Sequence, residues 1–241
     1  MATCACPLPA RDCLSLSSNS HCPLSPSNVM TSPHEKIPTR FAVLFEGRSG
    51  STYLVEALNS HPQIRAEKEL LAGLKKKIKK GMAEAADQLD CIDKLYRPGD
   101  HDYDVIGFKT KMKDILDPAE LAAVLRKNNV RILLLQRRNR IKLLVSLMNA
   151  MRLNEATGDW NLYKDSDRQA TIKLDPAEFR DWLEGAEEAN RELNSYAHGL
   201  GLPVLELYYE DILTDASATF AKICDFLGVA DRPMQGDCKK N

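Results

Sequence analysis

The sequence RFAVLFEGRSGSTYL, from Arg40 to Leu54, contains the most informative pattern of the chain. Phe41 to Phe45 is an apolar run typical of a buried strand, and Glu46-Gly47 ends it. Arg48-Ser-Gly-Ser-Thr follows and leads into a helical pattern, which predicts a strand, a tight turn and a helix in succession. Unpaired N–H groups at such a helix start converge on one point, where the helix dipole and Arg48 add positive charge. The stretch therefore predicts a site for a phosphate or sulfate group.

Strand and helix patterns alternate through the rest of the chain. Strands are predicted at 41–46, 105–110, 130–136 and 202–209, and helices at 49–61, 71–96 (with a break at Gly81 left open), 117–129, 141–156, 175–199 and 215–228. Such alternation implies parallel β-α-β units, so we expect an α/β fold, a three-layer α/β/α sandwich with a central parallel sheet. Ligands of such sheets bind beyond the carboxyl ends of the strands, where the Arg48 turn is expected.

The composition is that of a globular protein. The chain has 241 residues, of which 44% are hydrophobic and 28% charged, and its net charge is −1. No overall field favours nucleic acid, and no apolar segment approaches the ~20 residues that cross a bilayer. Anion binding must come from local clusters. One of these, KKKIKK at 75–80, is either a solvated helix face or a surface for an acidic partner or substrate.

The N-terminal segment differs from the remainder. Residues 1–38 are rich in Ser, Pro and Cys, and we expect them to be disordered, as a transit peptide or a plain extension. We expect 39–241 to form one domain, and whether its C-terminus is truncated stays open. The positions of the cysteines, four of them within the first 22 residues, argue against disulfides and favour a reduced compartment. These four lack the paired spacing of a zinc site, although Cys4-Ala-Cys6 and His21-Cys22 leave a metal site open. The expected location is cytoplasmic, or an organelle stroma or matrix if the tail is a transit peptide.

The turn after the first strand lacks the signatures of the common nucleotide sites. It has no Gly-Lys-Ser/Thr, so a magnesium-bound triphosphate is not favoured, and the chain has no G-x-G-x-x-G fingerprint. A second anion-binding element comes from Arg138, at the end of the strand 130–136, and Ser146, eight residues later in the following helix. The planar fork of arginine suits a phosphate group.

Together these motifs resemble those of the sulfotransferases that use 3′-phosphoadenosine 5′-phosphosulfate (PAPS). Arg48–Tyr53 resembles their 5′-phosphosulfate loop, and Arg138 with Ser146 has the spacing of their 3′-phosphate element. Tyr208–Ile212 and Phe226–Val229 resemble their YEDL and FLGV motifs. The resemblance spans residues 41–229. It implies a P-loop-NTPase-like sulfotransferase fold, closest in motif style to the carbohydrate and trehalose (Stf-zero-like) types, with PAPS as donor and no metal.

The resemblance also implies which residues bind the donor. They are Arg48, Ser49, Gly50, Ser51, Thr52, Tyr53, Arg138, Ser146 and Tyr209. Tyr53 and Tyr209 would approach the adenine from opposite sides, and each is alternatively a core or boundary aromatic.

Three residues are expected to take part in the chemistry. Arg48 would neutralise charge on the leaving phosphate, and Lys109 would assist it. Glu69 is our choice for the base, with Glu67 in reserve, because carbohydrate-directed sulfotransferases place a glutamate soon after the first helix. Lys111 stands where aryl and steroid sulfotransferases carry a histidine.

The implied reaction moves a sulfuryl group from PAPS to a hydroxyl of a carbohydrate or glycolipid-like acceptor. Thr157-Gly-Asp-Trp160 resembles an element of trehalose-type enzymes, and Trp160 could pack on a sugar or belong to the core. Two alternatives remain: a kinase-like nucleotide-dependent transferase, and a catalytically inactive nucleotide-binding module of the same fold.

Overall fold

The computed structural model describes residues 37–97, 99, 103–160 and 175–236. Almost all of the tail that the sequence predicts to be disordered therefore lies outside the described residues. Within them, every helix is too short or too polar to cross a membrane.

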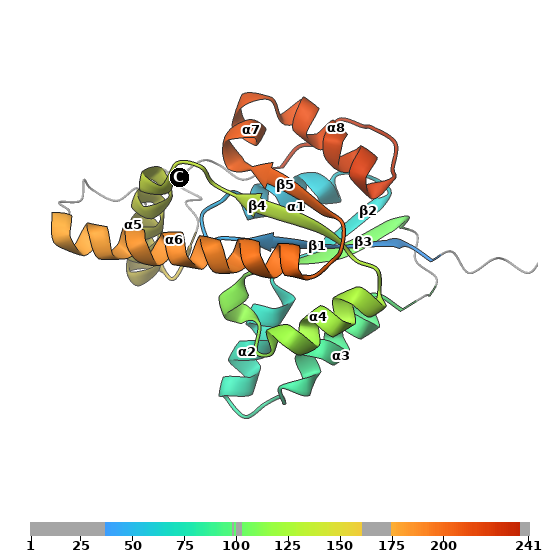
Figure 1. Ribbon diagram of the computed structural model, residues 1–241, viewed down its shortest axis with the longest axis horizontal. Helices are drawn as coiled ribbons and strands as arrows, with labels where there is room; N and C mark the ends of the chain where they lie inside the picture. The colour runs from blue at the N-terminus through green and yellow to red at the C-terminus, as the bar shows by residue number, and fades with distance from the viewer. Residues whose placement is uncertain (1–36, 98, 100–102, 161–174, 237–241) are drawn as a thin grey trace, which may run out of the picture. The chain divides into compact units, whose positions relative to one another are not determined.

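A five-stranded parallel sheet forms the centre of the fold, in the order β2-β3-β1-β4-β5 (Figure 1). The strands are β1 (Thr39–Phe45), β2 (Ile64–Glu67), β3 (Val105–Thr110), β4 (Arg131–Gln136) and β5 (Val204–Tyr208). In the β1–β3 register Leu44 lies opposite Thr110, so the two strands end side by side. The residues that follow β1 and β3 are thereby brought to the same edge of the sheet.

Helices cover both faces of the sheet, which confirms the predicted α/β sandwich (Figure 1). One face packs against α1 (Ser51–Asn59), α7 (Tyr209–Thr214) and α8 (Ala216–Leu227). The other packs against α2 (Leu70–Lys79), α3 (Ala86–Leu95), α4 (Pro118–Lys127) and α6 (Pro176–Gly199). Helix α5 (Arg140–Thr157) packs on α6, and a 3₁₀ turn, η1 (Met112–Asp114), follows β3.

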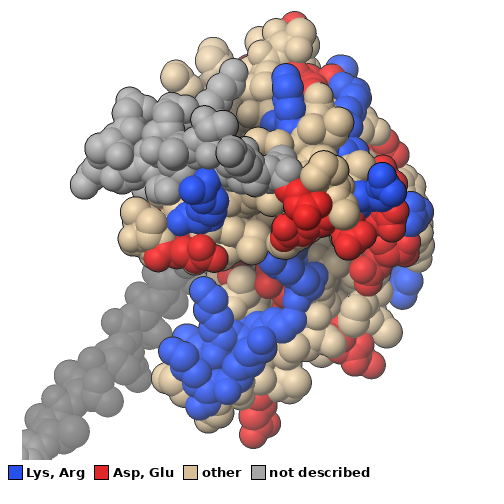
Figure 2. Space-filling model, turned by 90° about the vertical axis from the view of Figure 1, so that its left-hand side faces the viewer, with Lys and Arg blue, Asp and Glu red and all other residues tan. Residues whose placement is uncertain are grey.

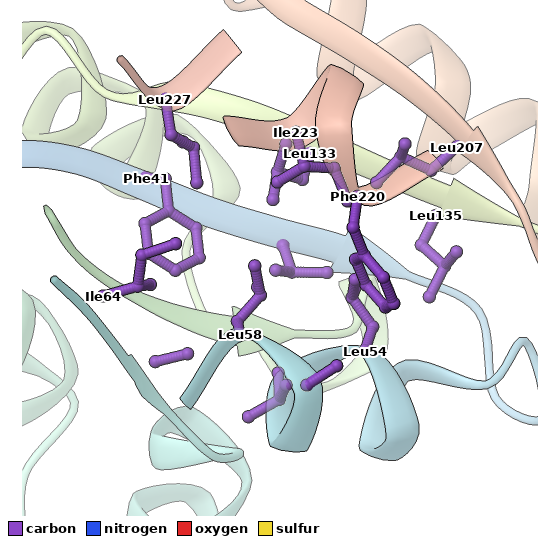
Figure 3. Packing of buried hydrophobic residues seen from close by; sticks show 14 of the residues in the cluster. Phe41, Leu54, Leu58, Ile64, Leu133, Leu135, Leu207, Phe220, Ile223 and Leu227 are labelled. Carbon is purple, nitrogen blue, oxygen red and sulfur yellow. The ribbon is translucent and has the colours of Figure 1, made fainter. Parts of the chain in front are cut away.

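The apolar run of β1 is explained by burial on both sides. Phe41, Val43 and Phe45 enter the core under α1 and α8, whereas Ala42 and Leu44 enter the core on the opposite face. Figure 3 shows the first of these cores, in which side chains of α1 and α8 pack against side chains of the strands. Each fully buried large side chain contributes about 1.5–3 kcal/mol. The strand that carries the Arg48 turn is thus held firmly at the centre of the sheet.

The structure corrects the sequence-based boundaries in three places. Ile64–Glu67 forms the edge strand β2, which the sequence did not predict because only its alternate residues are buried. The region 71–96 forms two helices, because α2 ends at Lys79 and α3 begins at Ala86, and Gly81, with φ of 69°, lies in the break that the sequence left open. Tyr209 begins the short helix α7 rather than ending the preceding strand.

Candidate active site

The turn between β1 and α1 has the geometry of an anion cradle. Arg48 and Gly50 both have positive φ, 67° and 85°, and Gly50 is the N-cap residue of α1. The Ser49 hydroxyl donates to the carbonyl of Glu46 at 2.7 Å, which fixes the turn. No side chain among the described residues caps α1, so the N–H groups of its first turn remain open to a ligand.

Gly50 leaves room that any side chain would take away. A Cβ at this position would lie 2.6 Å from Cδ2 of the Tyr209 ring, too close for two carbon atoms. The left-handed backbone adds a cost of about 1–2 kcal/mol for a residue with a Cβ. The turn therefore requires glycine both for its backbone and for its contact with Tyr209.

We predict that Gly50→Ala lowers the free energy of unfolding by about 2 kcal/mol or more, since backbone strain and the contact with Tyr209 add. Chemical denaturation measures the change. Gly47→Ala is the matched control, because a Cβ there meets nothing within 4 Å. Equal stability of the two variants would contradict this reading of the turn.

Arg48 reaches from the turn toward α5. Its Nε donates to the Ser146 hydroxyl at 3.1 Å, and one terminal nitrogen donates to the carbonyl of Trp160 at 3.0 Å. Arg137 in turn donates to the carbonyl of Arg48 at 3.0 Å and lies over the Tyr209 ring, 4.5 Å from its centre. Burial, and then the charge of Arg137, lower the pKa of Arg48 from its ordinary value. Two guanidinium groups are thus held close together beside the cradle.

Lys109 brings a lysine to a turn whose own sequence has none. It is the penultimate residue of β3, next to β1, and its side chain is 3% exposed. Its ammonium donates to the hydroxyls of Ser51 and Thr52 at 3.3 and 3.2 Å. Burial lowers the pKa of Lys109, and the neighbouring Glu69 opposes that shift. The first helical turn of α1 is therefore flanked by Lys109 on one side and Arg48 on the other.

Glu69 lies between two lysines at the N-terminus of α2. One carboxylate oxygen is 3.5 Å from the Lys109 ammonium, and the other is 2.6 Å from that of Lys111, which also lies 3.5 Å from Asp114. Burial raises the pKa of Glu69, but the hydrogen bond and charge of Lys111, with Lys109, outweigh it, so the pKa is below its ordinary value. Glu69 is therefore an ionised carboxylate at neutral pH, in contact with a lysine of the cradle.

This arrangement predicts how Lys111 sets the pH dependence of activity. A base acts when ionised, so the acidic limb of kcat/KM should lie below the ordinary carboxyl pKa of 4.5. Lys111→Met removes the main interaction that lowers the pKa while burial still raises it, and the limb should move to higher pH. The pH profile of kcat/KM measures this. Lys113→Met, an exposed neighbour, is the control, and an unmoved limb in Lys111→Met would contradict the assignment.

Arg138 contacts the segment Tyr208–Asp211. Its guanidinium forms a bidentate pair with Asp211 and lies 3.9 Å from the centre of the Tyr208 ring. The Glu210 carboxylate accepts the backbone N–H groups of Arg138 and Asn139, both at 3.0 Å, at the start of α5. Among the described residues no hydrogen bond joins Arg138 to Ser146. A role for Arg138 in binding phosphate therefore stays a prediction.

The remaining predicted residues divide between core and surface. Tyr53 packs near Phe220, with ring centres 6.4 Å apart, and Trp160 is 51% exposed. Glu67 pairs with Arg65 at 2.7 Å and lines a groove of about 480 Å³ along β2. Neither Arg48 nor Lys109 lines that groove. We therefore take the turn after β1, where Arg48 and Lys109 lie, as the candidate active site, and not the groove.

Comparison with known proteins supports a common fold. No family model and no curated protein sequence matches the chain. A sulfotransferase from Alicyclobacillus acidocaldarius superposes with a TM-score of 0.51 at 16% identity, over 85% of this chain and 86% of that one. The chain has the sulfotransferase fold.

Two further sulfotransferase structures superpose less closely. The sulfotransferase domain of the curacin biosynthetic pathway gives a TM-score of 0.49 at 16% identity, over 82% of this chain and 76% of that one. A mouse sulfotransferase complexed with PAP gives 0.44 at 14% identity, over 80% of this chain and 60% of that one. At these identities the likeness is one of fold, and the activity must be argued from the site.

Proposed function

We propose that the protein is a PAPS-dependent sulfotransferase that acts on a hydroxyl of a carbohydrate or glycolipid-like acceptor. The observation that carries the proposal is the cradle at the start of α1, where Arg48 and Lys109 flank open N–H groups and Glu69 lies beside Lys109. Transfer of an anionic group to a hydroxyl requires cations and N–H groups that stabilise the negative charge of the donor. It also requires a base, such as a carboxylate, that accepts the proton of the hydroxyl.

The residues of the cradle fit a phosphosulfate group. Gly50 keeps its space free of side chain, the first turn of α1 has no capping side chain among the described residues, and two cations are within reach. Ser146, held by Arg48, would contact a second phosphate, together with the adjacent Arg137. When bound, PAPS supplies the sulfuryl group and a phosphate leaving group.

The roles of the chain's residues follow from charge. Glu69 accepts the proton of the acceptor hydroxyl as its oxygen forms a bond to sulfur. The bond from sulfur to the phosphate oxygen breaks, its electron pair stays on that oxygen, and 3′-phosphoadenosine 5′-phosphate (PAP) is released. Arg48, Lys109 and the N–H groups of the turn neutralise the growing negative charge. Such preorganised electrostatic stabilisation is the largest contribution in many transfers of this kind.

Transfer of labelled sulfate from PAPS to a panel of sugars, glycolipids and phenols tests the proposal. We expect transfer to at least one hydroxylated acceptor, undiminished by a metal chelator. A kinase-like transferase would instead move phosphate from a nucleoside triphosphate and need magnesium. Binding of PAP without transfer to any acceptor would favour the inactive nucleotide-binding module.

A further inference from the structure

Helix α2 carries a row of lysines on its solvent face. Lys76 and Lys77 are exposed and lie four and three residues before Lys80, the exposed C-cap residue, so the three lysines lie on one side of the helix. On the opposite side Leu71 is buried in the core, and Ile78 is partly buried. Together with Lys75 and Lys79, these three lysines form a basic stripe, defined as the five lysines between residues 75 and 80. Figure 2 shows a basic patch in the lower part of the face, at the height of α2 in Figure 1.

The basic stripe has no acidic counterpart on its own helix. No Asp or Glu occurs from Leu70 to Gly81, and in the described part of the chain Lys76, Lys77, Lys79 and Lys80 form no ion pair. Like charges three or four residues apart on a helix destabilise it slightly. The helix dipole favours cations in the last turn, which offsets part of this cost. An external anion would relieve the remaining repulsion.

The basic stripe begins close to the proposed base. Glu69 is the N-cap residue of α2, and Lys75 donates to the carbonyl of Lys113, in the segment that carries Lys111. Along the helix axis, Lys75 lies about 9 Å and Lys79 about 15 Å from Glu69, at 1.5 Å per residue. One extended molecule can therefore reach Glu69 and the basic stripe together.

We propose that the basic stripe binds the anionic groups of an acidic saccharide chain, one hydroxyl of which is presented to Glu69. This inference rests on the proposed function and names the acceptor class of the same site. The five lysines lie within about 7.5 Å along the helix axis, at 1.5 Å per residue, and so form a compact positive cluster. Carboxylate or sulfate groups on neighbouring units of a saccharide are complementary in charge to such a cluster. Contacts to exposed lysines contribute mainly to encounter and orientation, so the basic stripe should affect KM more than kcat.

The test compares a carboxylate-bearing hexasaccharide with a neutral hexasaccharide, in the full chain. In the double variant Lys76→Glu/Lys77→Glu, kcat/KM for the acidic hexasaccharide should fall about tenfold or more because KM rises. The kcat/KM for the neutral hexasaccharide should stay unchanged. Arg180→Glu/Lys222→Glu makes the same charge change at exposed positions of α6 and α8, and should leave both values unchanged. The preference for the acidic chain should also weaken as salt is raised.

Direct binding separates this inference from the proposed function. Fluorescence-detected binding of the acidic hexasaccharide should weaken in the α2 variant and persist in the control variant, whether or not transfer occurs. Stripe-dependent binding with no transfer to any acceptor would overturn the proposed function alone. Equal use of the two hexasaccharides by the parent protein, an equal loss in both variants, or binding of acidic peptides in place of the saccharide would overturn the inference about α2.

Discussion

Replacing Glu69 with Gln should lower kcat for sulfate transfer by about 10²–10⁴-fold, the usual contribution of a general base. Gln has nearly the same shape, but its single amide oxygen can accept a hydrogen bond from only one of Lys109 and Lys111, and it cannot take the acceptor proton. We expect the affinity for PAP to stay nearly unchanged, because the Glu69 carboxylate contacts Lys109 and Lys111 and, among the described residues, forms no hydrogen bond with the turn after β1. Steady-state kinetics and calorimetry with PAP measure the two effects separately.

The matched control for this substitution is Glu67→Gln. Glu67 ends β2 and pairs with Arg65, away from the lysines of the site, so its loss should have little effect on kcat. Full activity of Glu69→Gln would refute the assignment, and a loss confined to Glu67→Gln would move the role of base to that residue.

Arg48→Ala should lower kcat by about 10²–10³-fold, as removal of one preorganised donor does elsewhere. The substitution removes a charge that lies at the turn itself, and it frees the hydroxyl of Ser146. Arg48→Lys should recover only part of the rate. Lysine keeps the charge but cannot contact Ser146 and the Trp160 carbonyl at once with a planar fork.

Ser146→Ala serves as the comparison for Arg48. It removes the hydrogen bond to Arg48 while the guanidinium charge remains, so its kcat should fall far less than that of Arg48→Ala. Kinetics at saturating PAPS measure both variants. If Arg48→Ala raised only KM and left kcat unchanged, Arg48 would bind the donor without stabilising the transition state.

The fold could be predicted from the sequence because its central strands are buried on both faces. The runs at 41–46, 105–110 and 130–136 are apolar without alternation, which only a covered parallel sheet explains. Strand β2 escaped prediction because it lies at the sheet edge, where Arg65 is exposed and the pattern is too short to recognise. The helix α7 escaped because its first residue continues the apolar run of β5.

The site was harder to predict, because its contacts join distant segments. The Arg48 turn follows from local sequence, but the contacts of Lys109 with Ser51 and Thr52 depend on the register of β1 and β3. The sequence does not show that Arg137 contacts the turn while Arg138 pairs with Asp211. Consecutive side chains at a strand end point to opposite sides, and spacing alone does not show which arginine faces the turn.

The most direct test of the account is titration calorimetry of the full chain with PAP. We predict that the parent protein binds one PAP per chain in a saturable way, without added metal. This binding should weaken in Arg48→Ala and persist in Glu69→Gln. Absence of PAP binding by the parent protein would contradict the account.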